Sequence, residues 1–381
     1  MSTLLVVEDL AHPAIVGWGG IALHVLHYLE GLRRLGHEVY FLEFLEEQPE
    51  PSAIRYFEEV IGSWWSRERA ALIVEPSLES VSGLSAAAVR EVAQRADAAI
   101  TLSAHYRREP WPLIYDVCPR VLIEADPAYT HLWAALEDDP ADIYGEHDFH
   151  FTVGLNIGTP RCSVPTLGLD WYAAPPPVVL DWWRGEAPLV RNRFTTIGVW
   201  RDYGGYLEFE DQVLGPKVEE FHKFMSLPRL AGEPLELAFV IDEDDPDRPL
   251  LEQSGWRLED PAIVSTPASF IEYVAGSAGE FTCANGGYVG TRCGWFPQRS
   301  ACYLAAGRPV VLQATGFEDV LPTGEGLFAV QDVDEAAAAI HAIRADYAHH
   351  SHAARAIAQE HLASAVVLGR LLEQVGIKPG D

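Results

Sequence analysis

A short stretch near the N-terminus combines three glycines with tryptophan and histidine: GWGGIALH runs from Gly17 to His24. Gly19 and Gly20 would let the backbone approach a sugar or a phosphate closely, and the free N–H groups at a helix start favour an anion. The spacing is not G-x-G-x-x-G, so a tight turn without a ligand is an equal alternative. Trp18 beside these glycines could pack against the protein or contact an acceptor.

Three side chains in the first half of the chain could move a proton. Asp126 ends the apolar run RVLIEAD, His105 ends DAAITLSAH, and His24 lies one turn into the helical segment. An acid at a strand end can act as general base on an acceptor hydroxyl. Asp126 also precedes Pro127, which is typical of a helix start, so helix capping is its alternative role. For His24 the alternative is a purely structural one.

The second half offers groups for an anion. A glycine-rich loop that includes Asn285 precedes a short helix expected to begin near Pro297. Ser300 and the neighbouring N–H groups would then face an anion, and Arg299 could add charge. Arg201 follows a strand-like run and Lys217 begins a helical one, so both could grip a diphosphate. Their alternative is a solvated surface charge.

The segment GEHDFHFTVGLNIG places His147, Asp148 and His150 within four positions. Such spacing could suggest a metal site. In a strand, however, Asp148 and His150 would face one side and His147 the other. No third cluster of ligands is evident, so we expect no metal and prefer acceptor contacts by His147 or Asn156.

Composition limits the partners. The 381 residues carry 56 acidic and 27 basic side chains, a net charge of −29. This charge argues against nucleic acid or an anionic membrane, because phosphate binding needs clustered Lys and Arg. Five scattered cysteines, no basic-apolar leader and no apolar run of about 18 residues favour a cytoplasmic protein without a membrane span.

Strand-like and helical runs alternate along the chain, which predicts α/β architecture with parallel sheets. TLLVVED, EVYFLEFL, DAAITLSAH and RVLIEAD read as strands, and the alternation restarts at FTTIGVW. The proline-rich stretch 171–192 predicts a linker, because a central strand rejects proline. We therefore expect two doubly wound domains, 1–180 and 190–360, facing across a cleft, with a C-terminal helix in 361–381 that could pack back on the first domain.

Both halves resemble the two-domain nucleotide-sugar glycosyltransferases of the GT-B fold. YLAAGRPVVLQATG, with Gly307, Pro309 and Val310, is similar to the family segment EAMACGTPVV. LPTGEGLFAVQDVDEAAAAIHAI resembles the loop, strand and helix that follow it, and GWGGIALHVLHYLEGLRRLGHEVYFLE resembles the family's opening. Many retaining members carry two glutamates ahead of this segment. Gly294 and Cys302 stand at those places here, which leaves the donor sugar and the stereochemistry open.

The resemblance implies transfer of a sugar from a nucleoside-diphosphate sugar, without a metal or another cofactor, to a small-molecule acceptor such as a specialised metabolite, or to a saccharide. A nucleotide-sugar 2-epimerase on the same fold and a non-catalytic two-lobed binding protein are the alternatives. Oligomeric state stays open. The expected site residues are Asp126, His105 and His24 for catalysis; Gly19, Gly20, Arg201, Lys217, Asn285, Arg299 and Ser300 for the donor; and Trp18, His147 and Asn156 for the acceptor.

Overall fold

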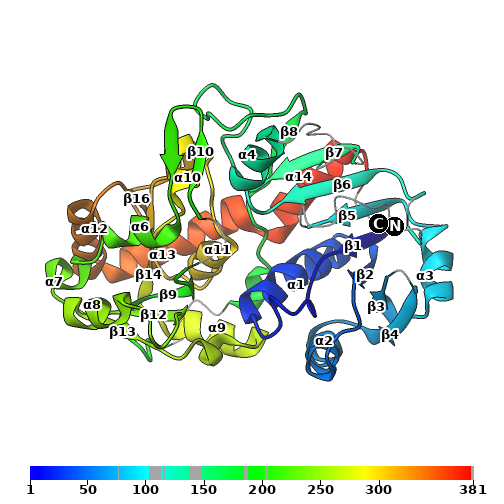
Figure 1. Cartoon of the computed structure of the whole chain (residues 1–381), viewed down its shortest axis with the longest axis horizontal. Helices are drawn as coiled ribbons and strands as arrows, with labels where there is room; N and C mark the ends of the chain where they lie inside the picture. The colour runs from blue at the N-terminus through cyan, green and yellow to red at the C-terminus, as the bar shows by residue number, and fades with distance from the viewer. Residues whose placement is uncertain are drawn as a thin grey trace.

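A computed structural model gives the fold of the chain, and it describes residues 1–75, 77–102, 113–114, 116–136, 144, 147–183, 188–201 and 205–378. Two α/β domains lie side by side, joined along one side by helices from the C-terminal part of the chain (Figure 1). Among the described residues, no helix is long and apolar enough to cross a membrane.

The first domain is built on an eight-stranded sheet, parallel except where β4 pairs antiparallel with β3. β1 and its neighbours are mostly apolar, as is typical of strands buried on both faces. The strands in spatial order are β4 (Glu79–Gly83), β3 (Ala70–Val74), β2 (Glu38–Leu45), β1 (Thr3–Val7), β5 (Ala98–Thr101), β6 (Arg120–Glu124), β7 (Phe149–Thr152) and β8 (Trp171–Ala173).

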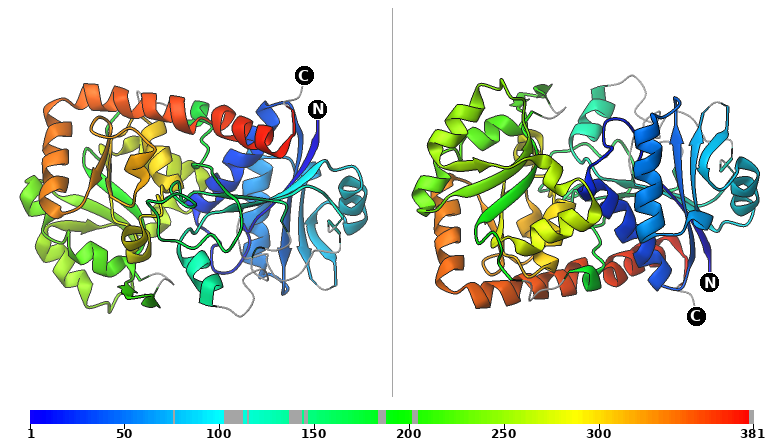
Figure 2. Two further views of the ribbon diagram at one scale, coloured as in Figure 1. Left: turned by 90° about the horizontal axis from the view of Figure 1, so that it is seen from above. Right: turned by 90° about the horizontal axis from the view of Figure 1, so that it is seen from below.

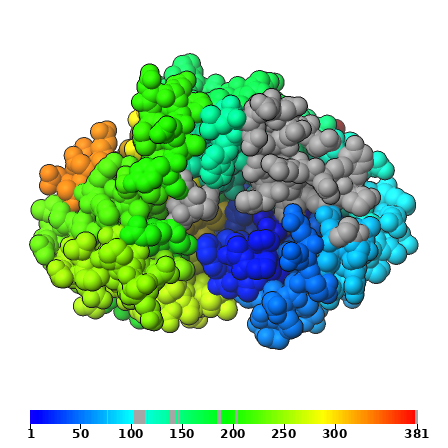
Figure 3. Space-filling model, in the orientation of Figure 1, coloured from blue at the N-terminus to red at the C-terminus, as the bar shows by residue number. Residues whose placement is uncertain are grey.

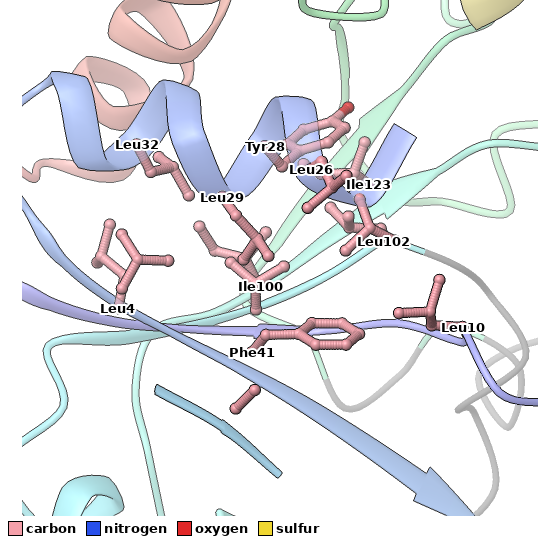
Figure 4. Packing of buried hydrophobic residues seen from close by; sticks show 14 of the residues in the cluster. Leu4, Leu10, Leu26, Tyr28, Leu29, Leu32, Phe41, Ile100, Leu102 and Ile123 are labelled. Atoms are coloured by element: carbon pink, nitrogen blue, oxygen red, sulfur yellow. The ribbon is translucent and has the colours of Figure 1, made fainter. Parts of the chain in front are cut away.

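Helices cover both faces of this sheet. One face packs against α1 (Gly19–Arg34) and α2 (Pro51–Trp64), with Tyr28, Leu29 and Phe41 in the contact (Figure 4). The other face packs against α3 (Ala86–Ala93). The remaining described helix of this domain, α4 (Tyr129–Leu136), follows β6.

The second domain holds a six-stranded parallel sheet. Its spatial order is β13 (Trp256–Leu258), β12 (Leu235–Val240), β9 (Phe194–Val199), β14 (Gly279–Thr282), β15 (Val310–Gln313) and β16 (Leu327–Val330). A hairpin of β10 (Leu207–Phe209) and β11 (Gln212–Leu214) projects from it. The helices are α6 (Lys217–His222), α7 (Leu227–Ala231), α8 (Asp247–Ser254), α9 (Pro267–Gly276), α10 (Gly286–Thr291), α11 (Gln298–Ala305) and α12 (Val333–Ala345).

Both sheets reverse their strand order next to the first strand of the domain. β1 lies between β2 and β5, and β9 lies between β12 and β14. Ligands of doubly wound sheets bind at such switch points, beyond the carboxyl ends of the strands. The expectation of two doubly wound α/β domains is therefore confirmed, and the two switch points are the places where sites are expected.

The chain crosses between the domains twice, and the two crossings are hydrogen-bonded to each other. Val178 N donates to Leu362 O at 2.7 Å, and Ser364 N donates to Val178 O at 2.8 Å. α13 (Tyr347–Ile357) and a π-helix, Ala358–Leu362, lead to the second crossing. Beyond it, α14 (Ser364–Val375) packs along α1 in the first domain, as both views of Figure 2 show.

Two sequence predictions were wrong in detail. The stretch 171–192, expected as a linker, begins with the edge strand β8, because an edge position tolerates the prolines that follow. The loop expected before Pro297 contains a helix, α10. Its glycines are needed for close approach: a Cβ at Gly286 would lie 2.7 Å from Gly215 O.

Candidate active site

Residues that follow the strands of the two sheets meet along one seam between the domains. Tyr129 Oη at the start of α4 donates to Gly215 O at 3.1 Å and accepts from Gly287 N at 3.2 Å. On the other side of the molecule, Tyr56 Oη donates to Ser265 O at 3.2 Å. In the space-filling view the surface is hollowed where the N-terminal segment meets the second domain (Figure 3). We take this seam as the candidate site.

Asp126 lies on this seam, at the carboxyl end of β6. It is half-buried, and its carboxylate accepts a hydrogen bond from the Tyr288 hydroxyl of α10. α4 itself begins three residues later, at Tyr129. The backbone O of Asp126 accepts from Thr130 Oγ1 at 2.8 Å, while the carboxylate points to the second domain. The Tyr288 ring stacks in turn on the Trp295 ring, with 4.8 Å between the two ring centroids.

Glu124 lies behind Asp126 and was not singled out by the sequence analysis. It is fully buried, and its Oε1 accepts from Asp126 N at 2.6 Å. Burial, and then the charge of Asp126, raise the pKa of Glu124 to about 8. His131 Nε2 lies 3.8 Å from Glu124 Oε2, and burial lowers the pKa of His131 to about 4. At neutral pH both groups are therefore uncharged.

The second domain brings Lys217 and Asn285 to the carboxyl ends of its strands. Lys217 is half-buried at the start of α6, where a Cβ on Gly198 of β9 would lie 3.6 Å from Nζ. Nζ also lies 5.8 Å from the centroid of the Phe239 ring. Asn285 is buried directly before α10, and its Oδ1 has no hydrogen-bond partner among the described residues. A lysine and an unsatisfied amide at the switch point suit a phosphate and a sugar hydroxyl.

Gly19 and Gly20 also lie on the seam, but protein atoms account for both. A Cβ on Gly19 would lie 2.5 Å from Val264 O, and one on Gly20 would lie 2.9 Å from the Phe270 ring. Both glycines therefore let α1 approach α9 and the turn before it. Trp18 beside them is 40% exposed and makes no side-chain cap to α1.

His24 reaches the second domain from α1. Its Nδ1 lies 3.3 Å from Gln298 Oε1 at the start of α11. Burial lowers the pKa of His24 to about 4, so the ring is neutral at pH 7. Its Nε2 is buried without a hydrogen-bond partner among the described residues. His27, one turn on, accepts from Val179 N at 3.1 Å and has a structural role. His105 lies outside the described residues.

The predicted anion grip at Ser300 and Arg299 is wrong for both side chains. Ser300 is fully buried, and its hydroxyl donates to Glu280 Oε2 at 2.5 Å. Arg299 pairs with the same carboxylate and also donates to Ile197 O at 2.5 Å and Thr282 Oγ1 at 2.7 Å. A buried carboxylate needs such partners, so both side chains fasten α11 to the sheet.

Arg201 follows β9 as expected, but its guanidinium is already paired. Nε donates to Asp245 Oδ2 at 2.6 Å, and Nη2 donates to Asp247 Oδ2 at 2.8 Å. The two carboxylates partly neutralise the Arg201 guanidinium, which weakens its attraction for a diphosphate.

The two expected acceptor contacts, Asn156 and His147, are used elsewhere. Asn156 is buried, and its Nδ2 donates to Gly316 O at 2.9 Å and to Asp319 Oδ2 at 3.2 Å, which fastens the two domains together. His147 Nε2 lies 3.0 Å from Thr101 Oγ1, and its ring packs against His150. His150 Nε2 donates to Tyr144 O at 3.1 Å. Among the described residues, no three potential ligands are arranged for a metal ion.

The architecture matches solved structures over the whole chain. The Anabaena protein HepE, in complex with UDP and glucose, has a TM-score of 0.62 at 13% identity and covers 99% of this chain and 100% of its own. The fold is GT-B. An alpha-glucosyltransferase in complex with UDP-glucose and DNA containing an abasic site has a TM-score of 0.57 at 12% identity, with 98% of each chain covered. AviGT4, a glycosyltransferase involved in avilamycin A biosynthesis, has a TM-score of 0.55 at 14% identity, covering 99% of this chain and 97% of its own.

No family model matches the sequence, and no curated protein matches it significantly. In this GT-B chain, the seam between Asp126 and Lys217 is where the two doubly wound domains bring their strand ends together. The interdomain partners Tyr129, Tyr288 and Gln298 escaped the sequence analysis. Tyr129 and Tyr288 each form a hydrogen bond across the seam with a residue about 90 or 160 positions away in the chain. A single sequence does not show such a pair, because it forms only when both domains are docked.

Proposed function

We propose that this protein is a glycosyltransferase that moves a sugar from a nucleoside-diphosphate sugar to an acceptor bound on the first domain. The observation that carries the proposal is the position of Asp126. It stands at a strand end of one GT-B domain, hydrogen-bonded to Tyr288 of the other, beside the elements that carry Lys217 and Asn285. A base and a cation on opposite walls of one seam are what this transfer needs.

The roles follow from charge and position. Lys217 stabilises the negative charge that develops on the leaving diphosphate, and Asn285 Oδ1 accepts from a donor hydroxyl. Asp126 takes the proton of the acceptor hydroxyl if the reaction inverts the anomeric centre. Glu124 is a positioning residue, since its carboxyl accepts from Asp126 N and is itself uncharged at neutral pH. The Tyr288 hydroxyl fixes the direction of the Asp126 carboxylate.

UDP is the preferred nucleotide of this proposal, because the solved structures that share the fold include UDP complexes. A small molecule, such as a specialised metabolite, is the preferred acceptor, with a saccharide second. AviGT4 supports the first choice. One protein of the same fold binds DNA, but a net charge of −29 opposes a polyanionic acceptor here.

Donor binding is tested by calorimetry with UDP, GDP, ADP and TDP and with their glucose conjugates. The change is Lys217→Ala, and Lys378→Ala near the C-terminus is the matched control, because it removes the same charge from an exposed position. We expect about a tenfold loss of nucleotide affinity in the first variant and none in the second. If no nucleotide or sugar nucleotide binds the wild-type protein, the proposal fails.

Turnover separates the two alternative functions. A glycosyltransferase releases UDP at a rate that depends on added acceptor, whereas a nucleotide-sugar 2-epimerase turns over without one. A two-lobed binding protein releases none. Asp126→Asn should abolish acceptor-dependent release and keep nucleotide affinity, and equal turnover with and without every acceptor would favour the epimerase.

A further inference from the structure

The carboxyl end of the second sheet carries a buried amide side chain, Gln313. This residue ends β15 and is 3% exposed. It lies on the same face of the strand as Val311, which packs in one cluster with Val218 and Phe221 of α6. A buried amide is costly unless its donor and acceptor groups are satisfied. Gln313 therefore depends on hydrogen-bond partners within the protein.

Each end of the Gln313 amide has a partner on a different element. Oε1 accepts from Ala284 N at 3.1 Å, and Nε2 donates to Glu220 Oε2 of α6 at 2.7 Å. The orientation of the amide follows from this pairing, because a backbone N–H can only donate and must face the oxygen. Lys223 Nζ donates to both oxygens of Glu220 at 2.7 Å, which gives that carboxylate a counter-charge. Gln313 thus joins the segment that follows β14 to α6.

A second link joins the same two segments. Gly286 N donates to Gly215 O at 3.0 Å, across the contact that only glycine allows at position 286. The Tyr129 hydroxyl of the first domain also donates to Gly215 O. α6 and α10 therefore lie side by side at this end of the sheet (Figure 1).

Lys217 and Asn285 lie between these two links. Asn285 is the single residue between Ala284 and Gly286, where the links reach the connection from β14 to α10. Lys217 begins α6, between the points where the links reach that helix and the turn before it. The Asn285 side chain does not cap α10, and its buried Oδ1 has no partner among the described residues. The links therefore hold both backbones and leave the Asn285 oxygen available.

We propose that Gln313, through Glu220, is a positioning residue that sets the separation between Lys217 and Asn285. The inference rests on the proposed glycosyl transfer, in which Lys217 contacts the diphosphate and Asn285 contacts the sugar. Both contacts form on one donor molecule only when the two groups stand at the matching separation. A nucleoside diphosphate without a sugar uses the Lys217 contact alone. Gln313 therefore governs recognition of the sugar more than that of the nucleotide.

Gln313→Met tests the selectivity of this effect, because it keeps the length of the side chain and removes both hydrogen bonds. The lost contact with Ala284 N lies next to Asn285. Calorimetry should therefore show the affinity for UDP-glucose falling by about fivefold and that for UDP staying within about twofold of the wild-type value. Gln331→Met, an exposed glutamine just after β16, is the control and should bind both ligands as the wild-type protein does.

Coupling to Asn285 distinguishes positioning from a general loosening of the domain. Asn285→Ala removes the oxygen that Gln313 is inferred to position. Adding Gln313→Met to Asn285→Ala should therefore lower UDP-glucose affinity by no more than about twofold. Two independent losses would multiply. Multiplying losses, equal losses for UDP and UDP-glucose, or unchanged UDP-glucose binding in Gln313→Met would each overturn the inference.

An exchange of the two side chains tests the same link if Gln313→Met does not fold. Gln313→Glu places a carboxylate against Glu220 and should weaken UDP-glucose binding by about fivefold. Adding Glu220→Gln leaves an acceptor facing Ala284 N and a donor facing that acceptor, so UDP-glucose affinity should recover to within about twofold of the wild-type value. A double variant without recovery would overturn the inference. A wild-type protein that binds neither ligand would instead overturn the proposed function, and this inference with it.

Discussion

The Tyr288 hydroxyl of the second domain donates to the Asp126 carboxylate of the first, so a candidate base is held in place by the domain that carries Lys217 and Asn285. The bond can form only when the domains are docked. The orientation of the Asp126 carboxylate therefore depends on the docking of the two domains.

Tyr288→Phe tests that link. The ring contacts with Trp295 and Tyr129 stay, and the hydrogen bond to Asp126 is lost. We expect acceptor-dependent UDP release to slow by roughly tenfold while nucleotide affinity is kept, since a positioned base contributes about 10²–10⁴ in rate. Tyr172→Phe, in the edge strand of the first sheet, is the control. A Tyr288→Phe enzyme with wild-type turnover would show that the bond does not position the base.

Glu124→Gln tests the buried acid behind Asp126. Its pKa is raised from 4.5 to about 8 in the folded protein. Between these pH values the unfolded chain has lost a proton that the folded chain keeps, so the wild-type protein loses stability as pH rises. Across that window the loss is on the order of 5 kcal/mol, which glutamine removes.

The measurement is urea unfolding of both proteins at about pH 5, 6.5 and 8. The unfolding free energy of the wild-type protein should fall relative to Glu124→Gln as pH increases. Buried histidines such as His131 have lowered pKa values and act in the opposite direction, losing stability as pH falls, but they are present in both proteins. Parallel pH profiles would mean that Glu124 is ionised in the folded state.

Gly19→Ala tests the contact between α1 and the second domain. The added methyl group would meet the backbone oxygen of Val264 at 2.5 Å, which cannot rotate away. We expect the unfolding free energy to fall by about 1–3 kcal/mol, as in other overpacked sites. Gly369→Ala in α14 is the opposite case, because nothing lies within 4 Å of the added carbon, and it should stabilise the helix by about 0.5–1 kcal/mol. Thermal unfolding of the two variants gives both signs in one experiment.

The alternation of apolar runs was enough to predict most strands of both sheets, since buried parallel strands such as β1 and β2 are mostly apolar. The position of Asp126 could also be predicted, because the end of a parallel strand is a local property of the sequence. Helix α10 could not, since its three glycines oppose a helix on local propensity and only tertiary contacts explain them.

The site residues divide along the same line. From the sequence, Ser300 at a helix start indicates an anion contact. In the structure its hydroxyl donates a hydrogen bond to the buried Glu280 of β14, a partner that the local sequence around Ser300 does not reveal. Arg201 reads as a free cation until Asp245 of the β12–α8 connection is placed beside it. Partners from distant segments decide whether a polar side chain is available, and a single sequence does not show which segments become neighbours.

The return of α14 to the first domain has a consequence for biosynthesis. Leu368, Leu371 and Leu372 belong to the same buried cluster as β1 and α1, although the whole second domain separates them in the chain. Domains usually fold in the order in which the ribosome delivers them. Here the domain of β1 and α1 emerges before the second domain but lacks part of its interior until α14 leaves the exit tunnel, so of these two domains the one made earlier is completed later.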